Sequence, residues 1–194
     1  VRNSSLAYAG RTTTHTDTLG RSRSRIVDVA GNLRRAIDPP PGGTIRYDYD
    51  SFGHLNRIQD AIGAVSTGVH DVRGFRTRWS DADAGAWKFS PNSLGEVVAW
   101  TDAKGRSFTA AYDTLGRRVS RTELEGTSTW TWGSSATARN IGRLQSKAGL
   151  GYAESLAYDG FGRVSKRTIT TDKSYQYDYT YNSIGEIDTL TYPT

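Results

Sequence analysis

Hydrophobic and polar residues alternate one by one along many short stretches of this chain. In one stretch aromatic residues occupy every second position, at Tyr175, Tyr177, Tyr179 and Tyr181. A period of two is typical of β-strands with one half-buried face, because successive side chains point to opposite sides of the sheet. The helical period is not sustained over three turns anywhere in the sequence. We therefore expect an all-β fold.

A short string, Asp-x-x-Gly, punctuates the alternating stretches at regular intervals. Eight strict copies occur, where chance placement of Asp and Gly would give about two, which indicates an internal repeat. Two further copies carry Asn in place of Asp. The ten predicted turns begin and end at Asp17 and Gly20, Asp28 and Gly31, Asp50 and Gly53, Asp60 and Gly63, Asp71 and Gly74, Asn92 and Gly95, Asp102 and Gly105, Asp113 and Gly116, Asp159 and Gly162, and Asn182 and Gly185.

Each string has the chemistry of a tight hairpin turn. The Asp carboxylate can accept hydrogen bonds from backbone N–H groups two or three residues further on, and Gly adopts a positive φ without steric cost. The expected geometry is a type I turn closed by a G1 bulge. Because turns recur every 10 to 12 residues, about seven residues remain for each strand. The sequence predicts an antiparallel hairpin meander of about sixteen or seventeen strands.

The repeats predict one continuous array over residues 1–194. Its unit is about 21 residues long and holds two strands and two turns, with a degenerate pattern at 1–16 and 127–155. The aromatic residues keep one phase relative to each turn. We therefore expect their rings to stack into ladders across neighbouring strands.

Composition excludes several function classes. The chain has no Cys, which rules out disulfides and thiolate metal sites, and no apolar run long enough to span a membrane. The net charge is +5, but the Arg residues are spread through the repeats, so nucleic-acid binding is not expected. With 194 residues we expect a packed core. The lack of Met and of a signal peptide leads us to expect a piece of a longer protein.

Several turns extend into a longer motif: Tyr49-Asp50-Ser51-Phe52-Gly53, Tyr112-Asp113-Thr114-Leu115-Gly116-Arg117 and Tyr158-Asp159-Gly160-Phe161-Gly162-Arg163-Val164. These motifs resemble the YD repeat of RHS proteins, which include bacterial polymorphic toxins, the C component of insecticidal toxin complexes and the animal teneurins. The resemblance covers nearly the whole chain. It implies a curved or spiralling sheet that forms part of a hollow shell around a toxic domain.

The resemblance also implies partners and a location. The partners would be the remainder of the parent RHS polypeptide and its enclosed cargo domain, in a secreted or cell-surface bacterial protein. The Asp-Pro-x-Gly-Leu motif that supports autoproteolysis in this family is missing. A short array leaves open sheet edges, so edge-to-edge self-association is a further expectation.

No catalytic residue, metal site or cofactor is expected. Among the three histidines, His54 stands where other repeats have Arg and His70 where they have Tyr, so they and His15 are interpreted as substituted repeat positions. Asp81 and Asp83 could bind calcium or exchange protons, but their place in the turn register favours a structural role. We expect a non-catalytic structural scaffold.

Carbohydrate or cell-surface binding is the alternative function, because exposed aromatic rings can stack on sugars. Its candidate residues are Trp79, Trp87, Trp100, Trp130 and Trp132. A sugar site would use a local cluster, whereas aromatic residues occur in strand after strand. Packing of these rings within the sheet is therefore the favoured interpretation.

Overall fold

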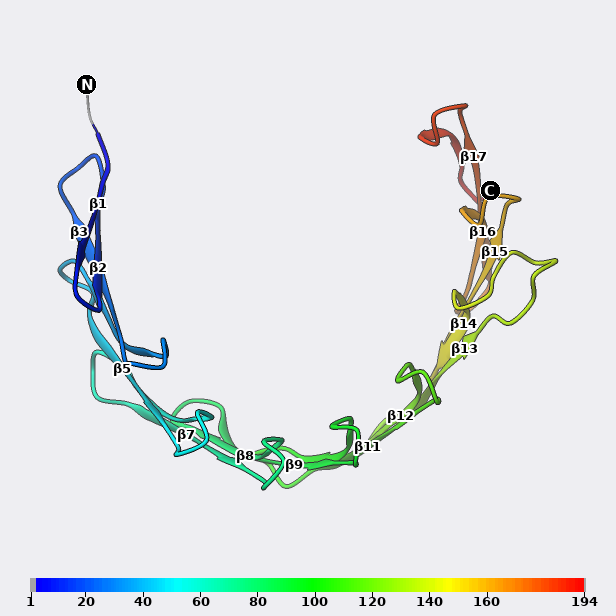
Figure 1. Ribbon diagram of the computed structural model, residues 1–194. Coiled ribbons are helices and arrows are strands. Elements are labelled where there is room, and N and C mark those ends of the chain that lie inside the picture. The colour runs from blue at the N-terminus through cyan, green and yellow to red at the C-terminus, as the bar shows by residue number, and fades with distance from the viewer. Residues whose placement is uncertain (1–2, 194) are drawn as a thin grey trace. The chain divides into compact units, whose positions relative to one another are not determined.

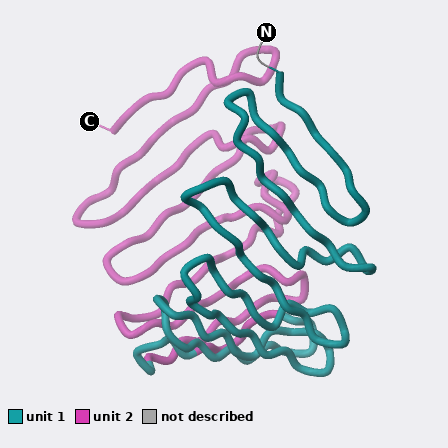
Figure 2. Tube along the Cα trace, turned by 90° about the vertical axis from the view of Figure 1, so that its left-hand side faces the viewer, with its two compact units in different colours: residues 1–95, 101–105 teal, residues 96–100, 106–194 magenta. Residues whose placement is uncertain are grey.

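The computed structural model describes residues 3–193, and within them all eighteen regular elements are β-strands (Figure 1). The ends of the predicted array, residues 1–2 and 194, lie outside the described residues. The chain forms two compact units (Figure 2), here called unit 1 (Val1–Gly95 with Thr101–Gly105) and unit 2 (Glu96–Trp100 with Arg106–Thr194). In the described part of the chain, no helix is long and apolar enough to cross a membrane.

Unit 1 is an antiparallel meander in which each strand pairs with the next strand along the chain. Figure 1 shows these strands side by side from β1 (blue) onward, in a sheet that curves along its length. The strands are β1 (Ser5–Ala9), β2 (Thr12–Thr16), β3 (Ser22–Val27), β4 (Leu33–Asp38), β5 (Gly43–Tyr49), β6 (Leu55–Gln59), β7 (Val65–His70), β8 (Arg76–Asp81) and β9 (Gly85–Pro91).

Unit 2 repeats the same design, with consecutive pairing from β11 to β18. Strand β10 (Val97–Thr101) is divided between the two units. The other strands are β11 (Ser107–Tyr112), β12 (Arg118–Glu123), β13 (Gly126–Trp132), β14 (Leu144–Gly149), β15 (Tyr152–Tyr158), β16 (Val164–Thr170), β17 (Ser174–Tyr181) and β18 (Ile187–Thr191). The prediction of an all-β array of antiparallel hairpins is thus confirmed.

The turn at Asp159 has the backbone geometry of a type I turn with a bulge. The N–H of Gly162 donates to the Asp159 carbonyl at 2.9 Å, and Gly162 has a φ of +77°. The pairing of β15 with β16 shifts register between Ala157 and Tyr158, which is the expected bulge. The carboxylate differs in one respect from the expectation. Its Oδ1 accepts N–H groups two and four residues on, from Phe161 and Arg163, because the bulge brings the fourth residue back toward the carboxylate.

The other nine Asp-x-x-Gly or Asn-x-x-Gly turns have the same backbone geometry. In each, the Gly N–H donates to the carbonyl of the Asp or Asn three residues earlier, at 3.0 to 3.3 Å, and the Gly has a φ between +74° and +95°. These turn glycines are Gly20, Gly31, Gly53, Gly63, Gly74, Gly95, Gly105, Gly116 and Gly185.

The structure has eighteen strands in the described residues, where the sequence predicted about sixteen or seventeen. Two of the hairpins involved lie in the degenerate stretches, where a two-residue loop replaces the Asp-x-x-Gly turn. Gly10 closes the β1–β2 hairpin at a φ of +58°, and Gly151 closes the β14–β15 hairpin at +66°. Such loops need a Gly but no carboxylate. A search for Asp-x-x-Gly therefore misses them.

The described residues of neither unit form a packed core, so that expectation was wrong. Ala110, at 8% exposure, is the only buried hydrophobic residue among those described. Among the described strands of each unit, only consecutive ones contact one another, so each unit is a single layer of sheet. A core requires a second layer against which an apolar face can pack. Backbone pairing and cross-strand side-chain contacts must therefore stabilise these sheets.

Candidate functional site

The aromatic residue that precedes the turn motif ties its strand to the strand before it. The Tyr158 hydroxyl donates to the Leu144 carbonyl at 2.6 Å, and the Tyr181 hydroxyl donates to the Val164 carbonyl at 2.8 Å. Burial raises the pKa of Tyr158. The same tie recurs at Tyr49 with Leu33, at Tyr112 with Val97 and, through the indole N–H, at Trp132 with Arg118. The Tyr of the motif is thus a hydrogen-bond donor that joins neighbouring hairpins.

The residue that follows the turn Gly has two roles. In unit 2 the Arg163 guanidinium pairs with Asp159 of its own turn at 2.7 Å. It also lies over the Tyr181 ring, 4.2 Å from the centroid. Arg117 pairs with Asp113 at 2.6 Å in the same way and lies over Trp132 at 5.1 Å. A recurring Asp–Arg–aromatic cluster therefore links each such turn to the following hairpin.

The turn Gly of the following hairpin leaves room for this side chain. A methyl group added at Gly162 would lie 2.7 Å from a guanidinium nitrogen of Arg143, and one at Gly95 would lie 2.6 Å from the Phe75 ring. These glycines are required twice, once for their positive φ and once for the close approach of a neighbour.

The predicted turn glycines of unit 1 differ in whether a neighbour approaches them. A methyl group added at Gly20, Gly31 or Gly63 would meet nothing within 4 Å. At Gly74 the added carbon would lie 2.5 Å from Nε2 of His54, the residue that follows the preceding turn of the same kind. At the first three positions only the backbone conformation calls for Gly, whereas Gly74 also makes room for the imidazole.

The predicted ladders of stacked rings are only partly present. Trp100 stacks on Phe108, with ring centroids 5.3 Å apart and planes at 8°. Elsewhere a guanidinium often covers the aromatic face, as in the Arg–aromatic clusters above. Because the motif places Arg directly after the turn Gly, the ladder alternates cations with rings.

The five candidate tryptophans are distributed over both units. Trp79 on β8 and Trp87 on β9 are direct cross-strand partners in unit 1. The other three lie in unit 2, Trp100 on β10 and Trp130 and Trp132 on β13. Neighbouring groups already cover several of these rings: Arg76 lies 4.6 Å from the Trp79 centroid, and Phe108 stacks on Trp100. Of these five, strand register places Trp79 opposite Trp87, while Trp130 and Trp132 lie two residues apart on one strand.

A buried carboxylate that the sequence analysis did not single out lies in the middle of unit 2. Glu154 on β15 pairs with Lys147 on β14 and Arg167 on β16, each at 2.9 Å, and accepts a hydrogen bond from the Tyr152 hydroxyl. Burial alone would raise the pKa of Glu154, but these donors and charges outweigh it and lower the pKa to about 2. Strand register is the signal that could have identified this carboxylate, because Glu154 lies directly opposite Lys147 on one neighbouring strand and Ile169 on the other.

Two of the three histidines come together with a turn carboxylate in unit 1. The His54 Nδ1 lies 3.0 Å from Asp50 Oδ2, and the rings of His54 and His70 stack with centroids 5.0 Å apart. His70 Nδ1 is buried and has no hydrogen-bond partner. Burial, followed by the nearby His54 and Arg76, lowers the pKa of His70. From the sequence, His54 and His70 were each interpreted as a substituted repeat position and were not expected to meet.

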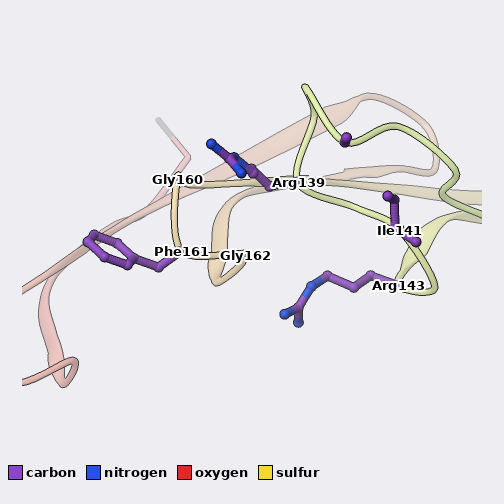
Figure 3. A pocket seen from close by; sticks show the side chains of 7 residues that line it. Arg139, Ile141, Arg143, Gly160, Phe161 and Gly162 are labelled. Atoms are coloured by element: carbon purple, nitrogen blue, oxygen red, sulfur yellow. The ribbon is translucent and has the colours of Figure 1, made fainter.

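An open hollow of about 330 Å³ lies beside the Asp159 turn in unit 2 (Figure 3). The residues that line it are Ala136, Arg139, Ile141, Arg143, Gly160, Phe161 and Gly162. Figure 3 shows the Phe161 ring pointing away from Ile141. Arg143 also lies 5.6 Å from the Tyr158 centroid and is adjacent to Gly162, as expected of a repeat position. We therefore interpret the hollow as space left between neighbouring turns and not as a ligand site.

A family model described as RHS repeat matches residues 92–128. No curated protein sequence matches the chain. The predicted resemblance to RHS, or YD-repeat, proteins is confirmed for that segment by its sequence, and the fold of the chain agrees with it.

Solved structures extend the likeness of fold to nearly the whole chain. The chain described as TcdB2-TccC3-Cdc42 matches with a TM-score of 0.81 at 16% identity, over 97% of this chain and 12% of that one. The Photorhabdus luminescens Tc holotoxin pore matches with a TM-score of 0.80 at 16% identity, over 98% of this chain and 12% of that one. The chain is thus an array with the RHS-repeat fold found in toxin complexes, and it spans about an eighth of the length of those chains.

Proposed function

We propose that this chain is a segment of the wall of an RHS shell that encloses a toxin or effector domain of a larger secreted bacterial protein. The observation that carries the proposal is the single-layer sheet of each unit, with one buried hydrophobic residue among those described. A single-layer sheet without a core of its own suits the wall of a shell, because it covers a large surface with few residues. The likeness of fold to toxin-complex chains supports the same role.

The mechanism is containment without catalysis. Each Asp turn, Arg–aromatic cluster and Tyr tie joins one hairpin to the next, so the wall grows along the chain without a second layer. The parent polypeptide and its cargo domain are the partners of this segment. Closing the sheet would pair its edges and separate the cargo from its surroundings.

Protease protection in the parent protein tests this proposal. We expect the cargo domain to resist trypsin in the intact protein and to be cleaved when Gly116→Val and Gly162→Val break two turns. The Gly160→Ala variant is the control, since Gly160 has open space around it and no positive φ. Equal cleavage of the cargo in the intact protein and in the broken-turn variant would contradict containment.

Carbohydrate binding through the five tryptophans remains a second prediction. The one favourable observation is that Trp79 and Trp87 are direct cross-strand partners, which offers a paired aromatic platform. Calorimetry with a panel of sugars tests it. Binding that is lost on Trp87→Ala would support the prediction, and no binding at millimolar sugar would count against it.

A further inference from the structure

We propose that Asp50, His54 and His70 form a binding site for a divalent transition-metal ion of the zinc class. One ligand atom from each side chain lies within 4.8 Å of the other two. Two imidazoles and one carboxylate are a recurrent donor set for such ions. All three residues are half-buried.

The site is a modified copy of the recurring Asp–Arg–aromatic cluster. His54 follows the turn Gly and occupies the place of Arg163, while His70 precedes the equivalent turn of the next repeat, at Asp71, and occupies the place of Tyr181. The Asp50 carboxylate lies beside His54 as Asp159 lies beside Arg163. Here histidines replace both the Arg and the aromatic residue. The cluster therefore carries two imidazole nitrogen donors, where the copy in unit 2 holds a guanidinium against an aromatic ring.

The state of His70 is the second observation. The Tyr or Trp at the equivalent positions donates to a backbone carbonyl of the preceding strand. His70 Nδ1 is instead buried with no hydrogen-bond partner. A buried polar atom without a partner is costly, and a metal ion would satisfy it.

The carboxylate is oriented before any ion arrives. Asp50 Oδ1 accepts the backbone N–H groups of Phe52 and His54, both at 2.9 Å. These bonds fix the side chain and direct Oδ2 toward His54 Nδ1 at 3.0 Å. Two of the three donors therefore need little rearrangement, which favours binding through lower ordering costs.

Titration of the whole chain, without a polyhistidine tag, tests the site. With Zn²⁺ in calorimetry we expect one ion per chain, and with Co²⁺ we expect visible absorption bands from a nitrogen and oxygen donor set. His54→Arg combined with His70→Tyr rebuilds the common repeat cluster and should keep the fold. We expect this variant to lose at least tenfold in Zn²⁺ affinity, whereas His15→Gln, outside the cluster, should bind like the unmodified chain.

Three results would overturn the proposal. One is the lack of Zn²⁺ binding by the unmodified chain at about 100 µM ion. Another is undiminished binding by the rebuilt variant, provided that its circular dichroism spectrum shows the same β-structure. The third is loss of binding on His15→Gln.

Discussion

Single residues in this fold act mainly by fixing turns. Gly162 illustrates the principle, because its φ of +77° is a conformation that other residues rarely adopt and a guanidinium nitrogen of Arg143 lies only 2.7 Å from where a Cβ would be. Gly160, two residues earlier in the same turn, has neither constraint. The same residue type therefore has different importance at positions two apart.

Gly162→Ala should destabilise unit 2 by about 1–2 kcal/mol, because a Cβ in the left-handed region is sterically strained. Gly160→Ala should be neutral or stabilise by up to about 1 kcal/mol, since it restricts only the unfolded chain. Chemical denaturation of the two variants measures the difference. Equal losses at both positions would show that the turn geometry is not what constrains Gly162.

Neighbouring strands are joined by clusters of ion pairs and hydrogen bonds at a few positions. Glu154 on β15 connects β14 and β16 through Lys147 and Arg167. In a sheet without a core, such a cluster holds three neighbouring strands in register. A carboxylate with a lowered pKa in the folded state stabilises the fold above its unfolded pKa, and that contribution is lost as pH falls through the folded value.

Glu154→Gln should reduce the free energy of unfolding at pH 7 by about 1–3 kcal/mol, because it leaves two cations without their charged partner. The folded pKa is about 2 against an ordinary 4.5, so the difference between the two proteins should shrink as the pH falls from 4.5 to 2. Denaturation curves at several pH values measure this. Glu125→Gln, in an exposed hairpin loop, is the control, and a pH-independent difference for Glu154→Gln would contradict the assignment.

The sequence predicted the elements better than the contacts between them. The Asp-x-x-Gly string determines its own turn, so the copies from Asp17 to Gly185 mark hairpins correctly. The hairpins at Gly10 and Gly151 lack Asp and escaped the search. The contact between His54 and His70 depends on register between hairpins. Pairing the residue after one turn Gly with the residue before the second turn Asp that follows, one 21-residue repeat on, would have revealed it.

At the scale of the whole molecule, each sheet lacks a second layer and the meander ends in terminal strands. β1 begins the meander of unit 1 and pairs there with β2, and β18 pairs in unit 2 with β17. A terminal strand uses one edge for this pairing, and the other edge can pair with another chain. Leu6 and Tyr8 on β1 are 53% and 73% exposed and add apolar surface to that edge.

The isolated chain should therefore self-associate through its edges as concentration rises. Leu6→Lys combined with Tyr8→Lys should reduce this association, because lysines on an edge strand oppose pairing with a second sheet. Val72→Lys changes an equally hydrophobic but fully exposed turn residue and is the control. Sedimentation velocity measures the mass at each concentration. A chain that stays monomeric throughout would contradict edge pairing.

The confinement of contacts to consecutive strands has a consequence for how such a gene can change. Excising the codons from Asp50 to just before Asp71 removes 21 residues, that is, one outgoing strand and one returning strand, and rejoins a turn to an equivalent turn. Excising a single strand would instead reverse the direction of everything downstream. Recombination within the gene should therefore be tolerated in steps of one whole repeat, so the encoded sheet can be lengthened or shortened by duplication and loss of repeats while each remaining hairpin keeps its neighbours.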